Sequence, residues 1–270
     1  MTLRIWGAGS GEGSDNDFGT AINWTGDTLP VNDDDLIFPD GAPACTGSMD
    51  QSAKHFGKII VEDCVVGATG TPLTLDGANE TDLLQVNDGE CYIDGKVTTV
   101  TGQSGTLQLD GTIATLNAFG GTITVVTGAS ITTINHGSAS SSSGAAQTTI
   151  PAGVTLSTVR QKAGRITNSS AIATLERYGG SMTHEAGAIT TLTNEGGVLT
   201  WNDGAIATAR IFGGTLDGSG GTTARAITTL ERYPGSTVNL ANGRHNITVT
   251  TNRYFGGNEI IDVGREYALS

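Results

Sequence analysis

The chain has 270 residues, of which 40 are glycine, 15% are charged and 5% are aromatic, and its net charge is −13. This composition excludes a mainly helical protein, because glycine weakens helix interiors, and it excludes a disordered chain, because 37% of the residues are apolar. Residues 1–100 hold 17 acidic and 4 basic residues and so carry all the net charge, which favours a basic protein surface as partner and excludes nucleic acid and anionic membranes.

Residues 1–55 do not repeat, and we expect them to form an N-terminal cap or docking element. They contain two of the three tryptophans, Trp6 and Trp24, and the densest acidic cluster, Asp33, Asp34 and Asp35. In one interpretation these residues cover the first coil of a repetitive domain, with the aspartates on a solvated turn. In the other they dock directly on a partner, and both interpretations can hold together.

The opening of the chain carries an ordered set of small motifs. A tryptophan is followed by an Asn-Trp pair, a proline before paired aspartates and an apolar pair, and a glycine-rich Thr-Leu strand, in residues 6–9, 22–24, 29–38, 56–61 and 67–75. This order resembles the opening of β-helical structural proteins of tailed bacteriophages and, more loosely, of secreted β-helix adhesins. The resemblance implies a virion component, such as a capsid decoration (cement) protein or a tail-associated protein.

Residues 56–250 contain an internal repeat. Three consecutive segments align without a gap and begin 17 residues apart, at Ile172, Ile189 and Ile206. Each has apolar residues at offsets 0, 3 and 10 and a Gly-Gly corner between two short strands. Looser copies begin at Val97, Ile113, Ile131, Val154, Ile227 and Ile247. The pattern predicts an all-β fold, a parallel β-solenoid (β-helix) with coils of about 17 residues, because sandwiches space strands less regularly and propeller blades need about 40 residues.

Two columns of equivalent residues should run along this solenoid. Threonine recurs at offset 2, in Thr99, Thr115, Thr133, Thr174, Thr191, Thr208 and Thr229. Antifreeze solenoids carry such columns, but offset 1 alternates between Thr and Ala here, and Thr suits any exposed strand. Aromatic residues recur at offset 6 in Phe119, Tyr178, Phe212 and Tyr233. With Tyr254 and Phe255, which belong to a C-terminal cap over residues 251–270, we expect these six aromatics to contact neighbouring subunits.

Catalytic, cofactor and metal sites are not expected. Glu176 and Glu231 share an offset but lie three coils apart, about 14 Å, which is too far for a glycosidase pair. Glu195 is on the coil next to Glu176 and is the closer candidate partner. The cysteines Cys45, Cys64 and Cys91 and the histidines His55, His136, His184 and His245 have no metal-ligand spacing, so we expect the thiols to be reduced and mostly buried.

We therefore expect a virion structural protein that decorates and stabilises a phage head shell. It would be made in the host cytoplasm, since no signal-peptide core is visible, and would bind the major capsid protein or other virion proteins, usually as a homo-oligomer. No membrane partner is expected, because no apolar stretch approaches 18 residues. A tail-associated protein that binds or depolymerises glycans is the first alternative, and an exported adhesin is the second.

Overall fold

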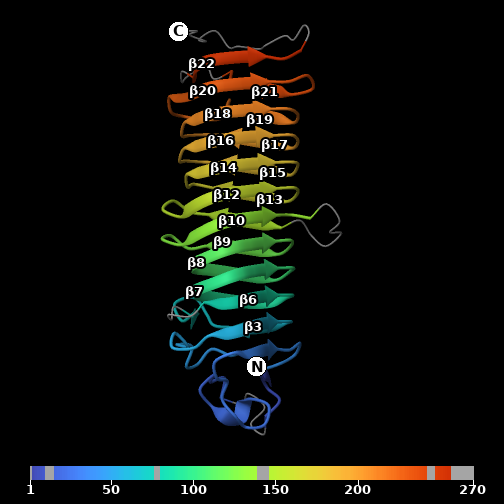
Figure 1. Ribbon diagram of the computed structural model, residues 1–270, viewed down its shortest axis with the longest axis vertical. Helices are drawn as coiled ribbons and strands as arrows, with labels where there is room; N and C mark the ends of the chain where they lie inside the picture. Colours follow the sequence, from blue (N-terminus) through green and yellow to red (C-terminus); the bar gives the residue numbers. More distant parts are fainter. Residues whose placement is uncertain (1, 10–14, 76–79, 139–145, 242–246, 257–270) are drawn as a thin grey trace. The chain divides into compact units, whose positions relative to one another are not determined.

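The computed structural model describes residues 2–9, 15–75, 80–138, 146–241 and 247–256 (Figure 1). These residues form β-strands stacked in parallel coils of about 18 residues, which confirms the predicted β-solenoid. The short 3-10 helix η1 (Ala21–Asn23) is the helical element of the described part, and no helix there is long and apolar enough to cross a bilayer. The chain divides into two compact units, 1–131 with 141–147 and 132–140 with 148–270.

The first unit begins its parallel ladder earlier than the sequence suggested. Strand β1 (Leu3–Ile5) pairs with β2 (Asp34–Phe38), and β2 pairs with β3 (Phe56–Val61), all in parallel. Two strands of the ladder therefore lie within the segment expected to be a separate cap. The unit continues with β4 (Cys64–Val66), β5 (Leu73–Leu75), β6 (Thr81–Val86), β7 (Gly89–Gly102), β8 (Thr106–Ala118) and β9 (Thr122–Val125).

Long connections in the first unit raise the average coil length. The register places Leu36 beside Ile59 and Ile59 beside Leu84, which are far larger steps than the 17 residues of the repeat. Between β7 and β8 the step is shorter, since Val100 pairs with Leu116. The strands β10 (Ser130–His136) and β11 (Gln147–Ile150) lie where the two units divide the chain.

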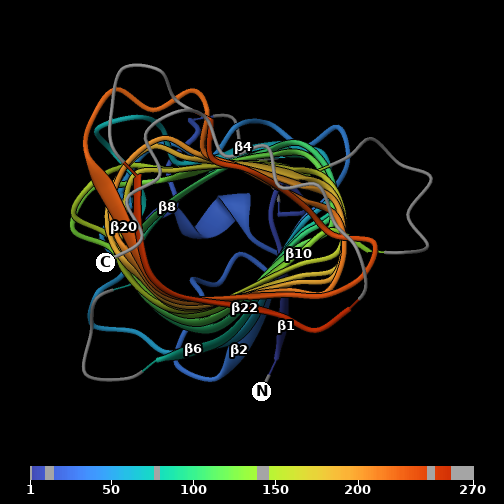
Figure 2. The same ribbon diagram turned by 90° about the horizontal axis from the view of Figure 1, so that it is seen from above.

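The second unit is regular. Its strands are β12 (Thr155–Gln161), β13 (Arg165–Asn168), β14 (Ile172–Arg177), β15 (Ser181–His184), β16 (Ile189–Asn194), β17 (Val198–Trp201), β18 (Ile206–Ile211), β19 (Thr215–Asp217), β20 (Arg225–Arg232), β21 (Thr237–Asn239) and β22 (Ile247–Tyr254). Even-numbered strands form one parallel ladder and odd-numbered strands from β13 to β21 another. Seen from above, the coils of this unit overlie one another (Figure 2).

The predicted offsets become columns in this register. Ile172, Ile189, Ile206 and Ile227 are successive partners and are all buried. The Gly-Gly corners are needed because the coils approach closely: Gly197 has φ +75°, and a Cβ there would lie 2.2 Å from the carbonyl oxygen of Gly180. Strand β22 carries the ladder beyond residue 250, into the expected C-terminal cap, of which residues 257–270 lie outside the described part.

Candidate functional site

The two N-terminal tryptophans are core residues. Trp6 and Trp24 are fully buried, with ring centroids 5.2 Å apart in an edge-to-face arrangement. Phe18 and Phe38 pack on Trp24 at 4.8 and 5.6 Å. The indole N–H groups donate to the backbone oxygens of Pro43 and Phe18, at 2.7 and 2.9 Å. The structure therefore places both tryptophans where they hold the first unit together, out of reach of a docking partner.

The three aspartates of the acidic cluster have different environments. Asp34 is buried, so the expectation of a solvated turn is wrong for this residue. It accepts hydrogen bonds from the Arg4 side chain at 3.1 Å and from the backbone N–H groups of Thr2 and Val31. Burial raises the pKa of Asp34, but these hydrogen bonds outweigh burial and lower it below the usual value. Asp35 is half-buried, and Asp33 is exposed and contacts His55 at 2.8 Å.

The surface of the first 100 residues is strongly acidic. The exposed carboxylates are Asp15, Asp27, Asp33, Asp40, Asp50, Glu62, Asp63, Glu80, Asp82, Asp88 and Glu90. Among the described residues of this segment, Lys96 is the one cation in the exposed class, while Arg4, Lys54 and Lys58 are half-buried. The charge asymmetry of the sequence is thus displayed to solvent by many dispersed side chains, and it does not depend on the Asp33–Asp35 cluster.

Part of the predicted aromatic column forms a continuous stack. Phe212 and Tyr233 stack with centroids 4.2 Å apart, and Tyr233 and Phe255 stack at 4.8 Å. Tyr178 is 46% exposed and is separated from Phe212 by Glu195, which occupies the same position on the coil between them. The stacked rings are nearly parallel, 24° and 12° between planes, so their faces cover each other and their edges remain on the surface.

The other two aromatics of the set lie elsewhere. Tyr254 is half-buried in β22, where the guanidinium of Arg232 lies 5.5 Å from its ring. Phe119 follows β8 in the first unit and is half-buried. Neither residue continues the Phe212–Tyr233–Phe255 stack.

A column of alternating charges, which the sequence analysis did not single out, runs beside the aromatic column. In register it comprises Arg160, Glu176, Thr193, Arg210, Glu231 and Arg253. Arg160 contacts Glu176 at 2.8 Å, and Arg210 and Arg253 contact Glu231 at 3.0 and 3.1 Å. The signal was present in the sequence, because all six residues share offset 4 of the repeat.

The predicted threonine column forms in the same ladder. Thr158, Thr174, Thr191, Thr208, Thr229 and Thr251 are successive partners, and in the first unit Thr99 pairs with Thr115. Together with the charges and the aromatics, the threonines give the β12–β22 ladder an outer surface of three parallel columns. The carboxylates of Glu176 and Glu231, three coils apart as predicted, are each occupied by arginines of this surface.

The interior of the second unit contains polar side chains in rows. Arg177 is fully buried and donates to Gln161 Oε1 at 3.0 Å, Asn194 Oδ1 at 3.2 Å and the Gly180 carbonyl at 3.1 Å. Burial lowers the pKa of Arg177 to about 10. In a second row, His184 contacts Asn168 and the Gly187 carbonyl, both at 2.9 Å. These groups stabilise the core and are shielded from ligands.

The remaining histidine and cysteine side chains form no metal centre. His136 is buried, and burial lowers its pKa to about 4. Cys45, Cys64 and Cys91 are unpaired and buried, as predicted, and burial raises the pKa of Cys64 to about 11. Among the described residues, no group of three or more His, Cys, Asp and Glu side chains is placed to hold a metal ion. His245 lies outside the described residues.

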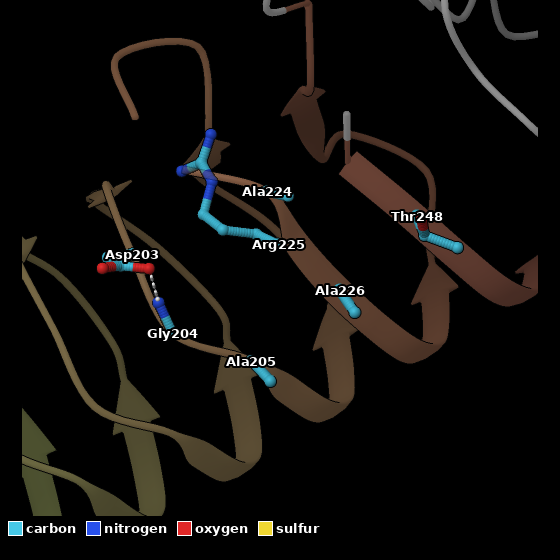
Figure 3. Close-up of a pocket in the computed structure, with 7 residues that line it drawn as sticks. All are labelled: Asp203, Gly204, Ala205, Ala224, Arg225, Ala226 and Thr248. Carbon is cyan, nitrogen blue, oxygen red and sulfur yellow. Dashed lines mark hydrogen bonds between the residues drawn. The ribbon is translucent and has the colours of Figure 1, made fainter. Parts of the chain in front are cut away.

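A pocket of about 630 Å³ lies on the second unit, lined by Asp203, Arg225, Thr248 and four small residues (Figure 3). Hydrogen bonds from the Thr223 hydroxyl and the Gly204 N–H lower the pKa of Asp203. The Arg225 guanidinium stacks on Trp201, 4.6 Å from the ring centroid, and donates to the carbonyl oxygens of Trp201 and Gly218. With one ionised carboxylate and a guanidinium engaged by protein groups, the lining lacks the paired carboxylates of a glycosidase.

No protein-family model, curated protein sequence or solved structure matches this chain.

Proposed function

We propose that this chain is a non-catalytic structural protein of a virion, which binds and stabilises the phage head shell by docking its acidic first unit on a basic protein surface. The observation that carries the proposal is the exposed charge of residues 1–100, where eleven carboxylates are exposed and Lys96 is the exposed cation. The resemblance of the chain's opening to β-helical phage proteins supplies the setting.

The solenoid suits such a role on physical grounds. Each coil is hydrogen-bonded to its neighbours over the whole length of its strands, so pulling or cleaving one loop leaves the rest of the ladder paired. A stiff domain bound to two shell subunits adds buried interface that the undecorated shell lacks. Dispersed surface charge contributes mainly to association rate and orientation, and its effect is screened by salt.

A salt titration of decorated particles tests the proposal. We expect the protein to leave the particles as NaCl rises, and Glu62→Lys to lower the salt concentration at which half is released. Glu185→Lys is the matched control, because Glu185 is an equally exposed glutamate of the second unit. Attachment that ignores salt, or equal effects of the two variants, would refute docking through the acidic unit.

A tail-associated glycan-binding role is the second candidate, favoured by the exposed ring of Tyr178. Sugars stack on open ring faces, and the Phe212–Tyr233–Phe255 stack hides its faces between neighbouring rings. Tyr178, whose ring is outside that stack, is therefore the residue to test. Loss of binding to immobilised host glycans in Tyr178→Ala, with binding kept in Phe212→Ala, would favour this role; no glycan binding by the unaltered protein would remove it.

A further inference from the structure

The outer surface of the β12–β20 ladder has a charge order that fits a second copy of the same surface. We define the charged face as the five offset-4 residues Arg160, Glu176, Thr193, Arg210 and Glu231 with the outward residues on either side of them. Alternate residues of a strand point to the same side, so this column lies between the threonines and the ring-bearing positions. The two arginines are 46% and 48% exposed.

We propose that the charged face binds a second copy of this chain in an antiparallel dimer, with the two-fold axis parallel to the strands at Thr193. Such an axis reverses the stacking order of the partner. Arg160 then lies opposite the partner's Glu231, and Glu176 lies opposite the partner's Arg210. Each contact occurs twice, so four ion pairs of opposite sign form around the axis.

Other positions of the axis give like charges. Half a coil further on, the axis would place Arg160 opposite the partner's Arg253 and Glu176 opposite the partner's Glu231. A full coil further on, it would place Arg210 opposite its own copy. The column is therefore self-complementary best in the register centred on Thr193, which is how polar groups select one alignment of repeated surfaces.

The existing ion pairs within the chain leave capacity for these contacts. Arg160 and Arg210 each reach a glutamate through Nε, and a guanidinium has five N–H donors while a carboxylate accepts several hydrogen bonds. The same register places Tyr178 opposite the partner's Phe212, which covers two rings that are 46% and 40% exposed. Glu195, at the aromatic offset of the central coil, meets its own copy near the axis.

The size of the face determines the expected affinity. Five coils about 4.8 Å apart span roughly 20 Å, and offsets 2 to 6 span roughly 13 Å along the strands. This is less than the roughly 800 Å² per partner of a standard stable interface. We therefore expect dimers at high protein concentration or where copies gather on a common surface, and the inference does not depend on the proposed docking of the first unit.

Site-directed crosslinking tests the axis. Thr193→Cys places a thiol beside its own copy, and a short bismaleimide suits the gap, because facing sheets lie about 10 Å apart, too far for a disulfide. Thr200→Cys is the matched control, since Thr200 is an outward, half-buried threonine on β17 of the same coil. The native cysteines are buried. We expect at least tenfold more crosslinked dimer from Thr193→Cys, and equal yields would overturn the proposal.

Charge reversal in the Thr193→Cys background tests the register. Arg210→Glu should abolish crosslinking, and adding Glu176→Arg should restore it, because opposite charges again face each other across the axis. Arg253→Glu is the control, since Arg253 also pairs with Glu231 but lies outside the facing contacts. Failure of the double variant to restore crosslinking, or loss of crosslinking in Arg253→Glu, would contradict this register. Glu195→Gln should increase the yield by removing the repulsion at the axis.

Discussion

The two units of this solenoid fix their coils by different means. In the first, connections are long and irregular, and the core near the N-terminus is built from large rings of different shape, including Trp6, Trp24 and Phe38. In the second, successive coils carry the same small residues at the same offset, such as the isoleucines paired from Ile172 to Ile227. An aromatic cluster fits one arrangement, whereas identical coils can exchange places.

That difference explains why polar groups are buried where the repeat is most regular. A ladder shifted by one whole coil would still place isoleucine on isoleucine, so the apolar columns alone do not select a register. Arg177, with Gln161 and Asn194 on the adjacent coils, has no equivalent partners one coil away. A buried polar group that must find its own partners specifies alignment at some cost in stability.

The largest expected effect is the loss of a ring from the first unit. Trp24→Ala removes a fully buried side chain that contacts Trp6, Phe18 and Phe38, and large aromatic-to-alanine changes cost about 3 to 5 kcal/mol. Urea unfolding followed by tryptophan fluorescence and circular dichroism measures the change. Ile22→Ala, two residues away at a side chain 45% exposed, should cost less than about 1 kcal/mol. Equal losses would show that the cluster does not hold this unit.

Acid should weaken the second unit selectively. Burial lowers the pKa of His136 from 6.5 to about 4, so the unfolded state binds a proton that the folded state refuses between these values. The free energy of unfolding is therefore full above pH 6.5 and falls as pH drops toward 4, by about 3 kcal/mol for this residue. The pKa of His184 is also lowered, mainly by burial, which adds in the same direction.

Hydrogen exchange as a function of pH separates the units. Amides of β12–β18 should lose protection between pH 6.5 and 4, while those of β2 and β3 should change less. In His136→Gln this loss should shrink, since the titrating group is gone. An unchanged pH dependence in that variant would assign the acid sensitivity to other groups.

The sequence predicted what the repeat determines and missed what depends on single partners. Equal offsets in successive coils must become neighbours in a parallel ladder, which is why the threonine column and the Phe212–Tyr233 stack could be foreseen. The burial of Asp34 could not, because it depends on Arg4 lying 3.1 Å away across β1 and β2, a contact between segments outside the repeat. Arg177 sits at an inward offset occupied elsewhere by Gln161 and Ile211, so composition at that offset predicts no fixed chemistry.

The smallest expected effect tests the buried polar row itself. Arg177→Met keeps the length of the side chain but leaves Gln161 Oε1 and Asn194 Oδ1 without their donor. Removing a buried cation offsets part of this loss, so we expect a net destabilisation of about 2 kcal/mol in urea unfolding. Arg210→Met, at a side chain 48% exposed, should change stability by less than about 0.5 kcal/mol.

Replacing the whole row decides between stability and alignment as its role. In the triple variant Gln161→Leu, Arg177→Met and Asn194→Leu, no side-chain oxygen of the row is left unpaired, and the Gly164 and Gly180 carbonyls keep their backbone donors Ser181 and Val198. We expect the lost stability to return, since apolar replacements of buried ionic groups are often neutral or stabilising. If the row fixes alignment, hydrogen exchange of the triple variant should show two or more populations over β14–β18. A single population with full stability would mean that the isoleucine and leucine columns alone select the register, and that the regular unit, like the aromatic one, needs no polar group to align its coils.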